Sequence, residues 1–130
     1  MKLLEQEIKA LLNKNAKERY VYFIKKVVDW ECAWSLGDES GYATTEDNNA
    51  QTSLPLWPAK EYAQECAINE WKNLSVKKVH LNELLDELLP QLIDDEIDIV
   101  VFMAPNETCV PVLSAMNVLT DLLKECEKYK

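Results

Sequence analysis

The apolar run LPLWP at residues 54–58 constrains the fold of this chain most, because it leads through a proline into a helical pattern. Pro58 has the fixed φ and the missing N–H that suit the first position of a helix. The pattern then continues to Trp71 with apolar residues on one side, at spacings of three and four. These residues are Tyr62, Ala63, Cys66, Ala67 and Trp71. The sequence therefore predicts a strand over residues 52–57 that feeds directly into a helix.

Two helices are expected before this unit. Apolar residues at helical spacing predict a first helix within residues 1–13, which we expect to be peripheral. Turn-forming residues at Asn13 and Asn15 end it, and a second helix is predicted from Ala16 to Trp30. The inward side of the second helix carries Tyr20, Phe23, Ile24, Val27 and Val28.

A β-hairpin is expected next. Both glycines of the chain, Gly37 and Gly41, lie between two short runs at residues 32–36 and 42–45. Glycine adopts the positive φ angles of tight turns without steric cost, so this placement indicates the turn of a hairpin. A polar loop at residues 46–51 then leads to the strand at 52–57.

The second half of the chain continues the alternation of strands and helices. Residues 76–80 alternate apolar and polar side chains, which is typical of a half-buried strand, and a leucine-rich helix follows over 81–92. Pro90 is expected to kink or end that helix. The most apolar strand, at 97–103, is expected inside the sheet. After a turn at 104–108 and a short segment at 109–112, a closing helix carries Met116, Leu119, Leu123 and Cys126.

The predicted order is ααβββαβαβ(β)α. Strand–helix–strand steps imply parallel pairing and the hairpin implies antiparallel pairing. We therefore expect an α+β fold with a mixed sheet of about five to six strands and helices mainly on one face. A length of 130 residues fits a single domain over 1–130.

The charge balance excludes some partners. The net charge is −9, so the chain should repel phosphate backbones and anionic membrane surfaces, and we expect no binding to nucleic acid or membrane. A basic protein is the partner that such a charge favours. The N-terminal residues lack the pattern of a signal peptide, and no apolar run approaches the length of a membrane span, so a cytoplasmic location is expected.

Cysteine and histidine do not form a recognisable motif. The four cysteines at 32, 66, 109 and 126 are far apart, so we expect reduced thiols, no disulfide and no zinc site. The acidic residues at 94–98 lack the spacing and the glycine of an EF-hand, which leaves a solvated turn. No glycine-rich phosphate loop, GxSxG or HExxH motif occurs, and no cofactor is predicted.

Several aromatic motifs resemble a known family. The run RYVYFIKKVVDW at 19–30, the WSL at 34–36, the PLWP at 55–58 and the EW at 70–71 are similar to those of small bacterial proteins grouped as a domain of unknown function. More loosely, residues 54–103 resemble the strand–helix–strand unit of type III secretion enhancer (SseB-type) domains. Neither resemblance implies a catalytic or ligand-binding residue.

Aromatic side chains are the main candidates for binding. Trp57, Trp71, Trp34 and Tyr42 are the predicted binding residues, with Trp30 as a further tryptophan of interest. The alternative is that they pack in the core, where tryptophan buries a large area. Because Trp57 and Trp71 lie at the ends of elements, we expect both to be partly exposed.

Two classes of function remain open. The first is a non-catalytic protein-interaction module, for instance an immunity or antitoxin-like protein that masks a basic toxin. The second is a small-molecule-binding protein or an enzyme with a Trp-lined pocket, in which His80 pairs with Cys109 or Cys32. A deep pocket that holds His80 and a cysteine within hydrogen-bond reach would favour the second class.

Overall fold

The computed structural model describes residues 5–46, 51–68, 71–103 and 112–128. The elements in chain order are α1 (Glu5–Leu12), α2 (Ala16–Trp30), β1 (Cys32–Asp38), β2 (Gly41–Tyr42), β3 (Thr45–Glu46), β4 (Thr52–Leu56), α3 (Lys60–Glu65), β5 (Ser75–His80), α4 (Leu81–Glu83), the π-helical η2 (Leu84–Leu88), α5 (Leu89–Asp94), β6 (Asp98–Val101), β7 (Val112–Leu113) and α6 (Ala115–Glu127). This arrangement confirms the α+β class, and the order differs from the predicted one mainly by the additional short strand β3.

Two small sheets replace the single sheet of five to six strands that we expected. One has the strand order β2-β1-β5 and the other has the order β3-β4-β6-β7. They meet where the backbone N–H groups of Trp34 and Trp57 each donate to the other residue's carbonyl at 2.8 Å. The prediction was wrong because the period of a strand shows which side chains are buried, but not which strand lies beside it.

The strand predicted at 97–103 lies inside its sheet, as expected. β6 pairs in parallel with β4 and antiparallel with β7, while β3 pairs antiparallel with β4. The four-stranded sheet is therefore mixed, which confirms the prediction. A parallel pair needs a long connection, and the segment from α3 to α5 supplies it between β4 and β6.

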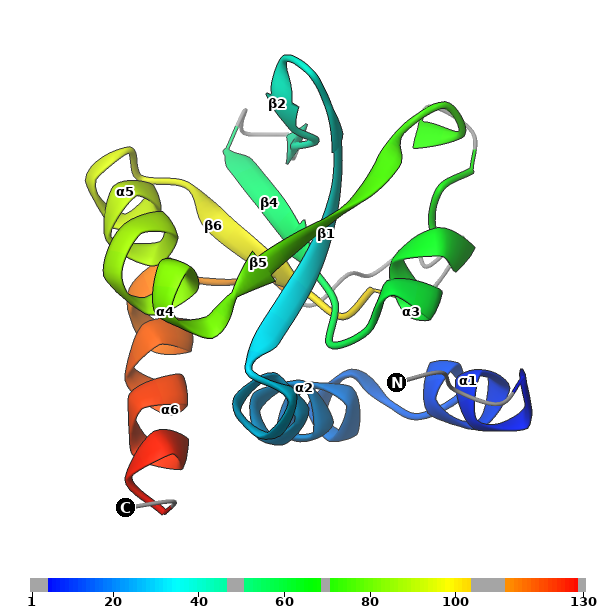
Figure 1. The fold of residues 1–130 in the computed structure, drawn as a ribbon, viewed down its shortest axis with the longest axis horizontal. Coiled ribbons are helices and arrows are strands. Elements are labelled where there is room, and N and C mark those ends of the chain that lie inside the picture. Colours follow the sequence, from blue (N-terminus) through cyan, green and yellow to red (C-terminus); the bar gives the residue numbers. More distant parts are fainter. Residues whose placement is uncertain (1–4, 47–50, 69–70, 104–111, 129–130) are drawn as a thin grey trace.

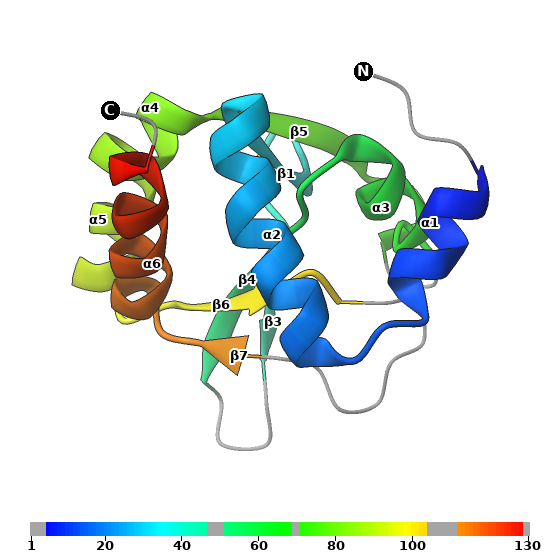
Figure 2. The same cartoon turned by 90° about the horizontal axis from the view of Figure 1, so that it is seen from below.

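Helices α6, α2 and α1 lie on the lower side of the strands in the view of Figure 1. α2 contacts one strand of each sheet, β1 and β6, and also packs against α6. Figure 2 shows α2 running between α6 on one side and α1 and α3 on the other. α1 lies at the end of this row, and its Leu11 packs against the core.

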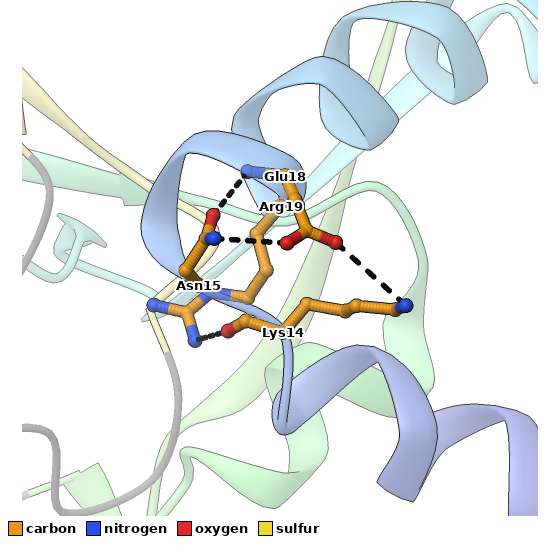
Figure 3. A network of polar contacts seen from close by, with 4 residues as sticks. All are labelled: Lys14, Asn15, Glu18 and Arg19. Atoms are coloured by element: carbon orange, nitrogen blue, oxygen red, sulfur yellow. Dashed lines mark hydrogen bonds and ion pairs between the residues drawn. The ribbon is translucent and has the colours of Figure 1, made fainter.

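Polar contacts fix the start of α2, as Figure 3 shows. The side-chain oxygen of Asn15 accepts a hydrogen bond from the backbone N–H of Glu18 at 2.8 Å, and its amide donates to Glu18 Oε1 at 2.8 Å. Lys14 Nζ lies 3.7 Å from Glu18 Oε2, and Arg19 donates to the Lys14 carbonyl at 2.9 Å. The Asn15 side chain thus pairs one of the backbone N–H groups that the first turn of a helix leaves without a partner. The predicted bounds of this helix, Ala16 to Trp30, are confirmed.

The helix predicted after Pro58 is shorter than expected. It begins at Lys60 and ends at Glu65, well before Trp71. Ala59, the N-cap, is extended with φ −147°, so Pro58 does not occupy the first helical position. The backbone pairing of Trp57 with Trp34 keeps the chain extended up to the proline and delays the helix.

Pro90 does not end its helix, contrary to one of the two outcomes that we expected. The chain stays helical to Asp94, and a π-helical stretch, Leu84–Leu88, precedes the proline. The N–H of Leu89 reaches back five residues to the carbonyl of Leu84. The π-helical turn therefore shifts the backbone hydrogen-bond pattern just before Pro90, which has no N–H to donate.

Candidate functional site

The entire net charge of the protein resides in one segment. Of the 23 acidic and 14 basic residues, residues 81–123 hold nine acidic ones and no lysine or arginine. The 14 acidic residues elsewhere balance the 14 basic ones. In the fold this segment forms α4, η2 and α5, then β6, β7 and α6, and its helices lie together at the left of Figure 1.

Most carboxylates of this segment face solvent. Six of them are exposed: Glu83, Asp86, Glu87, Asp94, Asp95 and Glu96. None of the six forms an ion pair with another residue in the described part of the chain. The backbone of Glu96 has φ 57°, and its carbonyl accepts a hydrogen bond from Gln51 Nε2 at 2.8 Å. The predicted solvated turn at 94–96 is thus an exposed acidic corner.

A hollow of about 410 Å³ opens between α5, β6 and the start of α6. We call it the α5–α6 groove, and its lining residues are Gln51, Leu92, Ile93, Glu96, Ile97, Asp98, Ser114, Ala115 and Met116. Apolar side chains make up much of the lining, while Glu96 and Asp98 add negative charge. Ser114 caps α6 by accepting a hydrogen bond from the N–H of Asn117 at 3.1 Å.

The closing helix has apolar side chains on two sides. The predicted helix is present, but its inward residues are Ala115, Val118, Leu122 and Glu125. The row that the sequence singled out points largely outward, with Met116 53% and Leu123 47% exposed. Leu119 and Cys126, in the same row, are half-buried. Met116 belongs to both the row and the α5–α6 groove, so the two form one apolar surface beside exposed carboxylates.

The tryptophan predicted to be the best anchor is buried. Trp57 has no exposed surface, so the expectation that it is partly exposed is wrong. Its indole N–H donates to the Met103 carbonyl at 3.0 Å, and the ring of Trp71 meets it edge-on with centroids 6.4 Å apart. Trp71 is half-buried, as expected. Backbone pairing with Trp34 and the ring of Trp71 hold Trp57 in the core.

Trp34 and Tyr42 lie on the other sheet and are half-buried under lysines. Lys78 Nζ lies 5.8 Å from the Trp34 ring, and Lys77 Nζ lies 5.3 Å from the Tyr42 ring. Trp34 lines a second hollow, which we call the β1–α3 groove. Its other lining residues are Trp30, Cys32, Pro58, Ala59, Lys60, Glu61 and Lys78. The structure therefore does not bring the four predicted binding residues together at one surface.

His80 and Cys32 lie directly opposite each other on β5 and β1. The Cys32 side chain is buried and His80 is exposed, and no hydrogen bond joins them in the described part of the chain. Cys32 lines the β1–α3 groove, whereas His80 does not. Cys109, the other partner considered for His80, lies outside the described residues.

Within the residues described, no three His, Cys, Asp or Glu side chains gather as a metal site would require. No described helix is long and apolar enough to cross a membrane. Cys32 is a buried free thiol, and Cys66 Sγ donates a hydrogen bond to the Met103 carbonyl at 3.3 Å.

Sequence reasoning located neither groove, although a Trp-lined pocket with Cys32 was one of the alternatives considered. The absence of basic residues from 81–123 was visible in the sequence and could have indicated the acidic surface. The outward direction of Met116 and Leu123 was not visible, because a helix with two apolar sides gives no signal for which side is covered.

Comparison with known proteins assigns a family and no activity. A family model described as a protein of unknown function (DUF2750) matches residues 20–122, so the chain belongs to that family. This confirms the resemblance to a domain of unknown function. No curated protein matches the chain.

Proposed function

We propose that this member of the DUF2750 family is a non-catalytic interaction module that binds a basic protein at the α5–α6 groove. The observation that carries the proposal is one continuous surface on which an apolar row and a hollow adjoin carboxylates without ion-pair partners. Exposed apolar patches with a polar rim are typical of binding surfaces. Since residues 81–123 contain no lysine or arginine, a basic partner meets no like charge from this segment.

The carboxylates and the apolar side chains of this surface would act at different distances from the partner. The net charge of −9 attracts a basic protein over about 8 Å at physiological salt and raises the association rate. Apolar contacts at Met116 and Leu123 then provide short-range affinity, which exposed charge pairs rarely supply. A basic amphipathic helix matches both needs, because it presents apolar residues at spacings of three and four beside lysines or arginines.

An immunity or antitoxin-like role is one form of this function. A protein that masks a basic toxin gains from a large negative charge, because fast association limits the time for which the toxin is free. The support for this form is the charge of 81–123 and the small size of the chain.

A peptide-binding experiment tests the proposal. The probe is a fluorescent 15-residue amphipathic helix of leucine and lysine, and its matched control carries glutamate in place of lysine. We expect the lysine peptide to bind at least about tenfold more tightly than the glutamate peptide. We also expect its binding to weaken between low and high salt. Equal affinity for the two peptides would contradict the proposal.

A pair of matched variants locates the site. Met116→Asn should weaken binding of the lysine peptide by about fivefold or more if the side chain is a central contact. Val21→Asn on α2 is the control, because Val21 is similarly exposed at 46% but lies away from the groove. If both variants weaken binding equally, the peptide does not bind at the α5–α6 groove.

A further inference from the structure

We propose that the β1–α3 groove is a separate binding site for a small aromatic anion that carries an N–H donor. The groove has a volume of about 400 Å³, within the range of small-molecule sites. Its lining residues are Trp30, Cys32, Trp34, Pro58, Ala59, Lys60, Glu61 and Lys78. This inference does not depend on the proposed protein-binding function, since the two grooves share no residue.

The fold brings three separate segments together to form the walls. Trp30 is the last residue of α2, and Trp34 lies four residues later on β1. The backbone pairing of Trp34 with Trp57 places the start of α3, with Lys60 and Glu61, beside β1. Two indole rings therefore line one hollow and offer flat apolar surface to a ring-shaped ligand.

Lysine side chains lie in and beside this groove without an ion-pair partner among the described residues. Lys78 Nζ lies 5.8 Å from the Trp34 ring, and Lys26 Nζ lies 5.3 Å from the Trp30 ring. Lys60 also lines the groove. None of these three lysines forms an ion pair with a described residue, although the chain has 23 acidic residues. Ammonium groups that have no carboxylate partner favour an anion over a cation.

Glu61 adds a hydrogen-bond acceptor to a groove whose lysines favour an anion. Glu61 is half-buried and lines the groove, so its carboxylate can accept a hydrogen bond from an N–H group of a ligand there. An aromatic ring, an anionic group and an N–H donor on one small molecule would thus meet the indoles, the lysines and Glu61.

The probe for this site is anthranilate, which joins a benzene ring, a carboxylate and an amino group. Benzoate lacks the amino group and aniline lacks the carboxylate, so the three compounds test each requirement in turn. Binding is followed through the ¹⁵N–¹H signals of the indole groups. We expect anthranilate to shift the signals of Trp30 and Trp34 saturably. The signals of Trp57 and Trp71 serve as internal controls, because neither residue lines the groove.

The expected order of affinity follows from the lost contacts. Benzoate and aniline should each bind about tenfold more weakly than anthranilate, as expected for loss of a hydrogen bond to a charged group. Lys78→Met should weaken anthranilate binding by a similar factor, while Lys72→Met, at an exposed lysine outside the groove, should leave it unchanged. Glu61→Gln should reduce the advantage of anthranilate over benzoate.

The outcomes that overturn the inference are distinct. Aniline that binds as tightly as anthranilate would show that the groove does not select an anion. Equal shifts of all four indole signals, or no shift at millimolar anthranilate, would show that anthranilate does not bind in the β1–α3 groove. An unchanged Trp57 signal in each variant verifies that the fold is intact, because its N–H bonds to Met103 in the core.

Discussion

At the scale of single residues, the two tryptophans around the corner after β4 differ in a way that mutation can measure. Trp57 is fully buried and donates a hydrogen bond to the Met103 carbonyl. Trp71 is half-buried, and its ring packs against the Trp57 ring with the two ring planes nearly perpendicular. We expect Trp57→Ala to lower the free energy of unfolding by about 3–5 kcal/mol, as large aromatic deletions do. Trp71→Ala should cost less, because less of its surface leaves water on folding. Urea denaturation of both variants tests this order, and a larger cost for Trp71 would contradict it.

Gly37 shows a residue-scale constraint of a different kind. A Cβ atom at this position would lie 2.4 Å from the Gly41 carbonyl oxygen and 2.8 Å from Lys77 Cε. The lysine can move, but the carbonyl belongs to the hairpin backbone. We expect Gly37→Ala to destabilise the protein by about 1–3 kcal/mol, the usual cost of overpacking. Ser40→Ala, in the exposed turn of the same hairpin, is the control and should change urea stability little. Equal effects of the two substitutions would argue against the clash.

At the scale of elements, the start of α2 depends on one exposed side chain. Asn15 accepts from the N–H of Glu18 and donates to its carboxylate, so its removal leaves the Glu18 N–H without this acceptor. We expect Asn15→Ala to cost about 0.5–2 kcal/mol of unfolding free energy. Asn13→Ala, two residues earlier and also exposed, should cost less than about 0.5 kcal/mol. Thermal or urea unfolding of the pair distinguishes loss of the cap from a general effect of removing asparagine.

At the scale of the whole molecule, four tyrosines make the fold sensitive to alkali. Burial raises the pKa of Tyr20, Tyr22, Tyr42 and Tyr62 above the ordinary value of 10.0. Tyr20 also donates a hydrogen bond to Asp121, which links α2 to α6. A raised pKa favours the protonated folded state. Its contribution is therefore complete below pH 10 and is lost as the pH rises toward the folded pKa. We expect urea stability to fall above pH 10, and Tyr20→Phe to make this fall shallower. A pH-independent stability from 8 to 11 would contradict the assignment.

The whole molecule also separates two kinds of surface. Residues 81–123 carry the net charge, while Lys60 and Lys78 line the β1–α3 groove together with Trp30 and Trp34. The net charge of −9 therefore describes neither the acidic surface of residues 81–123 nor the β1–α3 groove. Binding experiments on this protein should therefore vary salt and ligand charge independently.

Much of the local structure could be predicted because its causes lie close together in the chain. Asn15 and Glu18 define the start of α2, Gly37 and Gly41 mark the hairpin, and the apolar run at 97–103 gives β6 its place inside a sheet. The class, most of the element order and the mixed pairing followed from these signals. The candidate site was harder to predict, since only its acidic composition was visible in the sequence.

Tertiary structure decided whatever depends on contacts between distant segments. The two sheets meet at the backbone pairing of Trp34 with Trp57, and this pairing delays α3 to Lys60. Trp57 is fully buried there while Trp34 is only half-buried, a difference that the sequence does not show. Because α6 packs against α2 and α5, only one of its two apolar sides is covered, and Met116 and Leu123 remain at the surface. Periodicity records that a side chain can be buried, whereas burial itself requires a neighbour that only the folded chain supplies.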